Sequence, residues 1–425
     1  MGKRLGIYIH IPFCASKCAY CDFYSLAGCD RRMPDYQSAL LSHISESQDS
    51  MSSFEIDSIY FGGGTPSHYG AKRIVGILDE LKRQGNVRLD SEITVEVNPD
   101  SVKLDELKLL RREGVNRLFV DVQSADNDLL KIIGRRHNFR QAQNAVDMAR
   151  RAGFDNVSLD LIYGLPSQNK GDWAQTLSRA LELHPEHLSC YALKLEEGTP
   201  MHREYLNSPL IPDDDAQADM YLYTVETLEK YGLPQYEISN FAVPGYESRH
   251  NMKYWTLEDY MGFGPGAHSY VNGVRYSYIR SLEGYISAVK GDAQIIDEYE
   301  QSIPVQSAAE YIMLGMRLCR GINEDEYHRI YLSDWTPLEK TFESFRSKGW
   351  ARKNGDRWSL TPSGMLISNS LINVMLEAQT GTKVEYNPWF KPVFEAQEKQ
   401  TLPQGDNQWF EEFYRRLAED GRRDV

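Results

Sequence analysis

Short apolar runs alternate with longer amphipathic stretches over residues 1–235. The runs are rich in β-branched and aromatic residues and predict strands at 5–11, 56–61, 93–97, 117–122, 157–162 and 187–193. The intervening stretches have apolar residues at helical spacing and predict helices near 34–49, 71–84, 103–113, 138–152, 172–183 and 214–231. Strands that alternate with helices favour parallel pairing through right-handed crossovers, in a doubly wound sheet or in a barrel, complete or partial. Polar residues at the C-terminal ends of nearly every strand favour the barrel.

The pattern changes after residue 235. Residues 236–280 are rich in Tyr, Gly and Asn and predict irregular loops with a short hairpin around NGVRY, within a segment 236–300 that completes the core. Residues 305–378 predict a mostly helical, winged-helix-like accessory domain with a late strand, DRWSL. The tail, 380–425, is polar with aromatic islands. Its stretch WFEEFYRRL, 409–417, predicts an amphipathic helix that docks on the body of the protein or on a partner. The first domain is expected to span 1–235.

Composition excludes several classes of protein. The chain is 41% hydrophobic and 25% charged, as is typical of globular proteins. It has no run of about 18 apolar residues, so we expect no membrane-spanning helix. The start, MGKRLGIYIH, lacks the apolar core of a secretory signal, and we expect a cytoplasmic protein. The net charge of −14, with no Lys/Arg run, argues against a nucleic-acid partner.

Half of the six cysteines fall within eight positions, in the stretch HIPFCASKCAYCDF at residues 10–23. In a reducing compartment such a cluster predicts metal or redox ligands. Four cysteines would close a zinc site or saturate an iron–sulfur cluster. Three, here Cys14, Cys18 and Cys21, can hold three irons of a 4Fe–4S cluster and leave the fourth iron open for a substrate or cofactor. The alternative is a Cys₃His zinc site that uses His10 or His43.

The spacing C-x₃-C-x₂-C, with aromatic Tyr20 before the last cysteine, resembles the motif of radical S-adenosylmethionine (SAM) enzymes. The resemblance implies that the amino and carboxylate groups of SAM bind the open iron, and that one electron then cleaves SAM to a 5′-deoxyadenosyl radical. It also implies an α/β fold, a partial (βα)₆ TIM-like barrel with the cluster at the C-terminal mouth.

Further positions at strand ends fit the same resemblance. FGGGTP, 61–66, is similar to the segment that contacts the methionyl amino group, and its glycines would leave backbone N–H groups free for a ligand. Glu96 suits an ammonium or a ribose hydroxyl, and Arg135 suits a carboxylate. The SAM-binding positions that the resemblance implies are Tyr8, Tyr20, Gly63, Gly64, Thr65, Glu96, Gln123, Arg135, Asp160 and Ala192.

Four motifs, HIPFCxxKCxYCDF, FGGGTP, DLIYGLP and FGPGAHS, cover residues 8 to about 270. Together they resemble oxygen-independent coproporphyrinogen III oxidase and its relatives, a group that the accessory domain after 300 also fits. The decarboxylase itself has a further cysteine two residues after the third ligand. Phe23 stands at that position here, which argues against porphyrinogen decarboxylation.

A second stretch, HNMKYW at 250–255, is similar to the HNxxYW signature of HemW-type heme chaperones. That resemblance implies heme b as cargo and its transfer to heme-dependent respiratory proteins. Imidazole is a standard axial ligand of heme iron, and aromatic rings can stack on the macrocycle. The predicted heme contacts are His250, Asn251, Tyr254 and Trp255. Alternatively, the motif shapes the fold near the SAM site.

The leading hypothesis is therefore a heme chaperone that carries a 4Fe–4S cluster and SAM. The alternatives are coproporphyrinogen III oxidation and a radical SAM methyltransferase that modifies heme. Whether SAM is turned over stays open. A radical reaction would need a flavodoxin or ferredoxin as reductant, and peripheral contact with a membrane also stays open.

Overall fold

The computed structural model describes residues 2–381 except 292, 302–303 and 332–333, together with two short strands beyond them, β17 (Glu385–Tyr386) and β18 (Pro392–Val393). The helix predicted at 409–417 lies outside the described residues.

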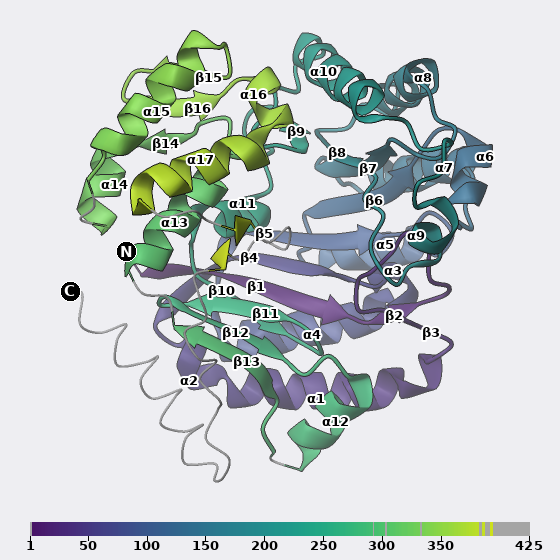
Figure 1. Ribbon diagram of the computed structural model, residues 1–425. Helices are drawn as coiled ribbons and strands as arrows, with labels where there is room; N and C mark the ends of the chain where they lie inside the picture. The colour runs from purple at the N-terminus through teal and green to yellow at the C-terminus, as the bar shows by residue number, and fades with distance from the viewer. Residues whose placement is uncertain are drawn as a thin grey trace.

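Six parallel strands in chain order form the centre of the structure (Figure 1). They are β1 (Lys3–Ile11), β4 (Phe54–Gly63), β5 (Asn86–Val97), β6 (Arg117–Gln123), β7 (Val157–Tyr163) and β8 (His187–Ala192). Each pairs with the next in parallel. The sheet ends at β13 on one side and at β9 on the other, so it stays open. All six predicted strands and the partial barrel are confirmed.

Helices connect the strands, as the apolar spacing predicts. They are α1 (Met33–Glu46), α2 (Gln48–Met51), α3 (Pro66–Tyr69), α4 (Ala71–Gln84), α5 (Leu104–Arg112), α6 (Asn127–Ile132), α7 (Phe139–Arg151), α8 (Lys170–Leu181), α9 (Pro200–Tyr205) and α10 (Asp214–Lys230). In α7 the buried residues Phe139, Ala142, Val146 and Ala149 recur every three or four positions, so one stripe faces the sheet. This packing fixes where each strand ends, and the strand ends carry the predicted site.

The prediction of irregular loops over 236–280 is wrong. This segment forms β9 (Asn240–Ala242), α11 (Arg249–Thr256), β10 (Tyr260–Phe263), β11 (His268–Val271) and β12 (Val274–Tyr278). β10 pairs with β1 in parallel, and β11, β12 and β13 (Ile296–Gln301) continue the sheet in antiparallel fashion; α12 (Leu282–Lys290) lies between the last two strands. The hairpin at NGVRY is confirmed, because Val271 pairs with Val274 across Asn272 and Gly273, which both have positive φ.

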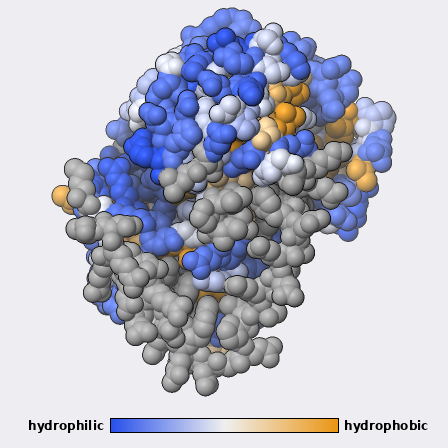
Figure 2. All heavy atoms as spheres, turned by 60° about the vertical axis from the view of Figure 1, so that its left-hand side comes forward, coloured by the Kyte–Doolittle hydropathy of each residue, from blue (hydrophilic) through white to orange (hydrophobic). Residues whose placement is uncertain are grey.

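The elements after residue 303 gather beside the sheet (Figure 1). They are α13 (Pro304–Gly315), β14 (Ile322–Asn323), α14 (Glu324–Tyr331), α15 (Thr336–Ser347), β15 (Ala351–Asn354), β16 (Arg357–Leu360), α16 (Pro362–Leu366) and α17 (Ser368–Thr380). A three-stranded sheet in the order β14–β16–β15 packs with the helices, and β16 is the predicted strand DRWSL. Figure 2 shows this side as mostly hydrophilic, with hydrophobic atoms toward its right-hand edge. The exposed apolar side chains of α16 and α17 include Leu366 and Val374.

No helix in the described ranges has the length and apolarity that a membrane span requires.

Candidate functional site

The three clustered cysteines lie on one loop that follows β1 at the C-terminal end of the parallel strands, which we call the mouth. The loop begins at β2 (Phe13–Cys14) and is closed at its far end by β3 (Leu26–Ala27), which pairs with β2; a short 3₁₀ helix (Asp30–Arg32) then leads into α1. Cys14 is buried, whereas Cys18 and Cys21 are half-buried. All the cysteines in the described ranges are free thiols. Burial raises the pKa of Cys14, and it raises that of Cys21 to about 11.

The turn after β4 holds the start of this loop. The backbone N–H groups of Gly64 and Thr65 donate to the carbonyls of Ile11 (2.7 Å) and Phe13 (2.8 Å). A Cβ on Gly64 would lie within 2.7–2.8 Å of the same two carbonyl oxygens, so only glycine fits. The expectation that these N–H groups stay free for a ligand is therefore wrong. Instead, the side chain of Thr65 donates to the sulfur of Cys14 at 3.3 Å.

The turn after α6 holds the other side of the loop. Ala19 N–H donates to the carbonyl of Ile133, and the guanidinium of Arg135 lies 3.6 Å from the sulfur of Cys18 and 3.5 Å from the hydroxyl of Tyr20. The same guanidinium forms an ion pair of 3.1 Å with Asp121. The structure thus brings Arg135 and Tyr20 together with Cys18. Asp121 escaped prediction, because it lies within the strand run RLFVDV; its inward position on that strand is the signal that could have revealed it.

Three carboxylates face one another at the mouth. Burial, followed by the charge of Asp121, raises the pKa of Glu96 and that of Asp160 to about 8 each, and burial also raises the pKa of Asp121. Gln123, at a positive φ of 65° after a register shift in β6, donates to Asp160 at 2.7 Å. The hydroxyl of Tyr60, a second residue that sequence reasoning missed, donates to Glu96 at 2.8 Å.

Several buried polar atoms at the mouth have no partner within the described part of the chain. They are Oε1 of Gln123, Oδ1 of Asp160 and Nε of Arg135. Buried polar atoms are normally satisfied, so unpaired ones on neighbouring strands fit a polar ligand. Acceptors and a guanidinium together complement the ammonium, hydroxyl and carboxylate groups of SAM. Ala192 ends β8 at the same rim and is exposed, and the Tyr8 hydroxyl contacts Nδ1 of His10 at 3.1 Å.

The donors around the cysteines fit an iron–sulfur cluster better than the Cys₃His alternative. A hydroxyl and a guanidinium point at cysteine sulfurs, and such donors tune cluster thiolates. Both ring nitrogens of His10 already lie within hydrogen-bonding distance of Tyr8 and of the Tyr24 carbonyl, and the ring of His43 contacts Tyr285. Among the described residues, no three His, Cys, Asp or Glu side chains are gathered to hold a single metal ion.

The predicted heme residues lie apart from the mouth. Helix α11 carries HNMKYW and packs against the N-terminal halves of β1 and β4, which we call the floor (Figure 1). His250 is fully buried, with Nδ1 3.0 Å from the hydroxyl of Ser58 and Nε2 2.8 Å from that of Tyr254. Asn251 and Trp255 are half-buried on the same helix. Gly6, which pairs with Ser58, stands five residues before the end of β1, about 16 Å along the strand.

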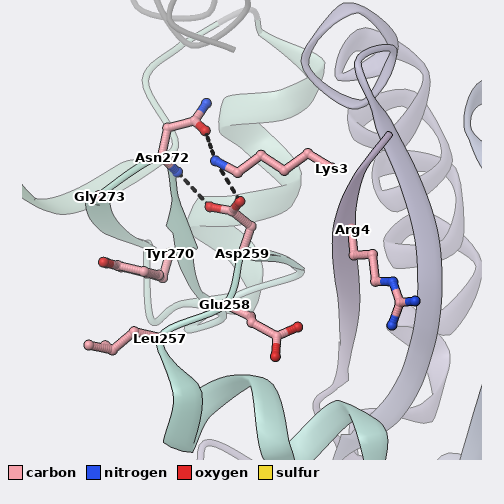
Figure 3. Close-up of a pocket in the computed structure, with 8 residues that line it drawn as sticks. All are labelled: Lys3, Arg4, Leu257, Glu258, Asp259, Tyr270, Asn272 and Gly273. Carbon is pink, nitrogen blue, oxygen red and sulfur yellow. Dashed lines mark hydrogen bonds and ion pairs between the residues drawn. The ribbon is translucent and has the colours of Figure 1, made fainter. Parts of the chain in front are cut away.

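A pocket at the floor end of β1 is shown in Figure 3. Lys3 spans it with an ion pair of 2.8 Å to Asp259 and a hydrogen bond to Asn272, whose backbone N–H also donates to Asp259. Its lining residues are Lys3, Arg4, Leu257, Glu258, Asp259, Tyr270, Asn272 and Gly273. It lies at the opposite end of β1 from the cysteines. A second hollow, beside the cysteine loop, runs from Ala15 to Arg136.

Comparison with known proteins places this geometry in a family. The model of the radical SAM superfamily matches residues 8–180, and that of the HemN C-terminal domain matches 305–367. Heme chaperone HemW of Bacillus subtilis is 32% identical over 372 residues, which are 87% of this chain and 98% of that protein. The HemW proteins of Lactococcus lactis (33%) and Escherichia coli (32%) each match 88% of this chain and 98% of their own length.

A solved structure has the same fold. Coproporphyrinogen III oxidase (HemN) from Escherichia coli, described as a radical SAM enzyme, superposes with a TM-score of 0.78 over 90% of this chain and 91% of that one. The two sequences are 21% identical, so this likeness shows the fold alone. The relatives that match along nearly their whole length decide the family: the chain belongs to the radical SAM superfamily and, within it, to the family of the heme chaperone HemW proteins.

Proposed function

We propose that this chain is a heme chaperone, which binds heme and passes it to heme-dependent proteins while it carries a 4Fe–4S cluster and SAM. The observation that carries the proposal is the match to proteins named heme chaperone HemW, at 32% identity over 98% of the length of the Bacillus subtilis relative. That match covers 87% of this chain, and the model of the HemN C-terminal domain matches residues 305–367.

In this proposal Cys14, Cys18 and Cys21 ligate the cluster. Support comes from their common loop and from the donors that Thr65 and Arg135 present to two of the sulfurs. When bound and reduced, the cluster would supply the one electron that splits SAM into methionine and a 5′-deoxyadenosyl radical. Backbone hydrogen bonds from the turns after β4 and α6 hold the loop on both sides, so the backbone that carries the three thiols is already ordered before a cluster binds.

SAM would bind across the mouth between the cysteine loop and the three carboxylates. Arg135 suits the carboxylate of SAM, and Glu96 and Asp160 suit its ammonium or ribose hydroxyls. The unpaired atoms of Gln123 and Asp160 support this placement. The proposed contacts also include Tyr8, Tyr20, Gly63, Gly64, Thr65 and Ala192, the last through its place at the rim of β8.

Heme is the proposed cargo, as the name of the relatives implies. Heme contacts by His250, Asn251, Tyr254 and Trp255 stay a prediction. In the described arrangement both nitrogens of His250 are already within hydrogen-bonding distance of hydroxyls, and the ring is fully buried. Coordination of iron by this ring would need it to give up one of those contacts and α11 to leave the floor.

Coproporphyrinogen III oxidation is the second candidate, because the fold of that enzyme is shared. Phe23 counts against it, since the side chain stands 65% exposed beside the third ligand, where the resemblance would require a cysteine. Methylation or other modification of heme is a third candidate. The proposed acceptors are respiratory heme proteins, the proposed reductant is a flavodoxin or ferredoxin, and the proposed location is the cytoplasm with peripheral contact to a membrane.

One anaerobic experiment separates these candidates. The reconstituted chain is incubated with SAM, a low-potential reductant and either heme or coproporphyrinogen III, and both tetrapyrrole and SAM products are followed by mass spectrometry. The proposal expects heme to be bound and recovered unchanged, and then transferred to an apo-acceptor. Formation of protoporphyrinogen IX would contradict it in favour of the oxidase, and heme consumed in step with SAM would contradict it in favour of a heme-modifying enzyme.

A further inference from the structure

Helix α11 is fixed to the floor by buried contacts to three strands. Glu92 of β5 accepts the backbone N–H groups of Arg249 and His250, each at 3.1 Å. The buried ammonium of Lys253 forms an ion pair of 2.9 Å with Asp57 of β4. A Cβ on Gly6 of β1 would lie 2.7 Å from the Lys253 side chain and 3.2 Å from Nδ1 of His250. These contacts fix the position of the helix against the sheet, and with it the positions of the side chains that point into the barrel.

The imidazole of His250 is held in a single orientation. Ser58 and Tyr254 contact its two nitrogens, and burial, followed by the charges of Lys253 and Arg117, lowers its pKa to about 3. The ring is therefore neutral at pH 7 and has one donor and one acceptor nitrogen, each with a hydroxyl beside it. A ring fixed at both nitrogens can serve as a rigid surface for a neighbour.

That neighbour is Tyr60. The His250 and Tyr60 rings stack with centroids 5.3 Å apart at 26°. The Tyr8 ring stacks on both, 6.3 Å from Tyr60 at 28° and 6.4 Å from His250 at 29°. The hydroxyl of Tyr60 donates to Oε1 of Glu96 at 2.8 Å. Ring contacts thus run from the floor helix to a carboxylate at the mouth.

We propose that His250 is a positioning residue for the SAM site: its ring fixes Tyr60, and Tyr60 fixes Glu96. The inference rests on the proposed binding of SAM and gives the floor helix a role in it. His250 touches neither the cysteine loop nor Glu96; its ring also stacks on that of Tyr8, but only the Tyr60 ring connects it to Glu96 through a hydrogen bond. In this proposal the stretch HNMKYW helps to hold Glu96 in position for SAM and does not itself contact SAM.

The test measures the affinity of the anaerobically reconstituted full chain for SAM, by calorimetry or equilibrium dialysis. Tyr60→Phe removes one oxygen atom and is expected to weaken SAM binding about fivefold, the effect of losing one hydrogen bond. His250→Ala is expected to weaken it to a similar extent. Because both act on Glu96 through the same ring, the double variant should bind no more weakly than the worse single variant. His250→Phe, which keeps a ring to stack on Tyr60, should recover most of the affinity.

His43→Ala is the matched control. His43 is also a buried histidine with a hydroxyl beside Nδ1, but it packs on Phe263 and Tyr278, away from Tyr60. The His43→Ala variant should bind SAM with the same affinity as the unsubstituted chain and should have the same iron content and circular dichroism spectrum. Unchanged SAM affinity in His250→Ala, or additive losses in the double variant, would overturn the inference alone. Failure of the unsubstituted chain to bind SAM would overturn the proposed function as well.

Discussion

The side-chain hydroxyl of Thr65 donates a hydrogen bond to the sulfur of Cys14 across 3.3 Å. A donor aimed at a cluster thiolate stabilises the reduced, more negative cluster more than the oxidised one. Loss of this donor should therefore lower the reduction potential of the cluster.

Thr65→Val keeps the shape and removes the hydroxyl. A net hydrogen bond contributes about 1 kcal/mol, which corresponds to about 40 mV for a one-electron couple, so we expect a potential lower by that order. A redox titration followed by electron paramagnetic resonance measures it. Thr65→Ser keeps the donor and should keep the potential; equal potentials in all three proteins would contradict the prediction.

Arg135→Ala should weaken SAM binding at least tenfold and destabilise the chain by about 1–3 kcal/mol, because it leaves Asp121 without its ion pair. The neighbouring Arg136 offers a matched control, since its side chain is 55% exposed and pairs with Asp100. Arg136→Ala should change SAM affinity and the unfolding midpoint little. Comparable SAM affinities for the two variants would count against a SAM contact at Arg135.

The stability of the cluster-free chain should fall as pH rises from about 4 to 8. The pKa of Glu96 is raised from 4.5 to about 8 and that of Asp160 from 3.8 to about 8. In this window the folded chain keeps protons that the unfolded chain has released. The contribution of each group to the free energy of unfolding is complete below its pKa in the unfolded chain and is lost as the pH rises through its pKa in the folded chain. The loss is at most about 1.4 kcal/mol per pH unit for each group.

Thermal unfolding between pH 5 and 8.5 measures this slope, and Glu96→Gln should make it shallower. Part of the slope should persist, because burial also raises the pKa of Glu237 to about 7. Glu55→Gln is the control: its hydrogen bond to Arg88 lowers the pKa of Glu55, so that residue is ionised throughout and its loss should leave the slope intact. A slope that Glu96→Gln does not alter would contradict the assignment.

Gly64→Ala should prevent stable assembly of the cluster. The added Cβ would meet the carbonyl oxygens of Ile11 and Phe13 at 2.7–2.8 Å and displace the start of the cysteine loop. Iron content after reconstitution measures the effect. Gly76→Ala, in the middle of α4, is the comparison; it meets only the flexible end of Gln37 at 3.2 Å and should be neutral or slightly stabilising. Full iron loading of Gly64→Ala would show that the loop adapts.

The six central strands and their helices could be predicted because each strand is a short run dominated by apolar, β-branched and aromatic residues and is followed by an amphipathic stretch. Strand β10 could not, because it is only four residues long and follows a loop with Leu257 at positive φ. Helix α11 was missed for a similar reason. Its sequence RHNMKYWT has weak helix formers, and the helix depends on Glu92, 157 residues away from Arg249 in the chain, to accept its first N–H groups.

At the site, the cysteines, Arg135 and Glu96 could be found because their motifs are local. Tyr60 and Asp121 could not, since they are single polar positions inside apolar strands, and only the register of the sheet turns them toward Glu96 and Arg135. The buried pair of Arg117 and Glu92 was missed for the same reason. The sequence also could not show what the Gly64 N–H group binds, because its partner is the carbonyl of Ile11 at the end of β1, 53 residues earlier.

The pairing of β10 with β1 has a consequence for the order of synthesis. β1 leaves the ribosome long before one of its two neighbours in the sheet, the strand Tyr260–Phe263. Until that strand emerges, β1 presents an unpaired edge, and the floor helix that rests on Gly6 is also missing. The cysteine loop also gains contacts late in translation, since Arg280 donates to the carbonyl of Asp22 and the N–H of Leu282 to the hydroxyl of Tyr24, so iron delivered to the nascent chain would meet a loop that is only partly supported.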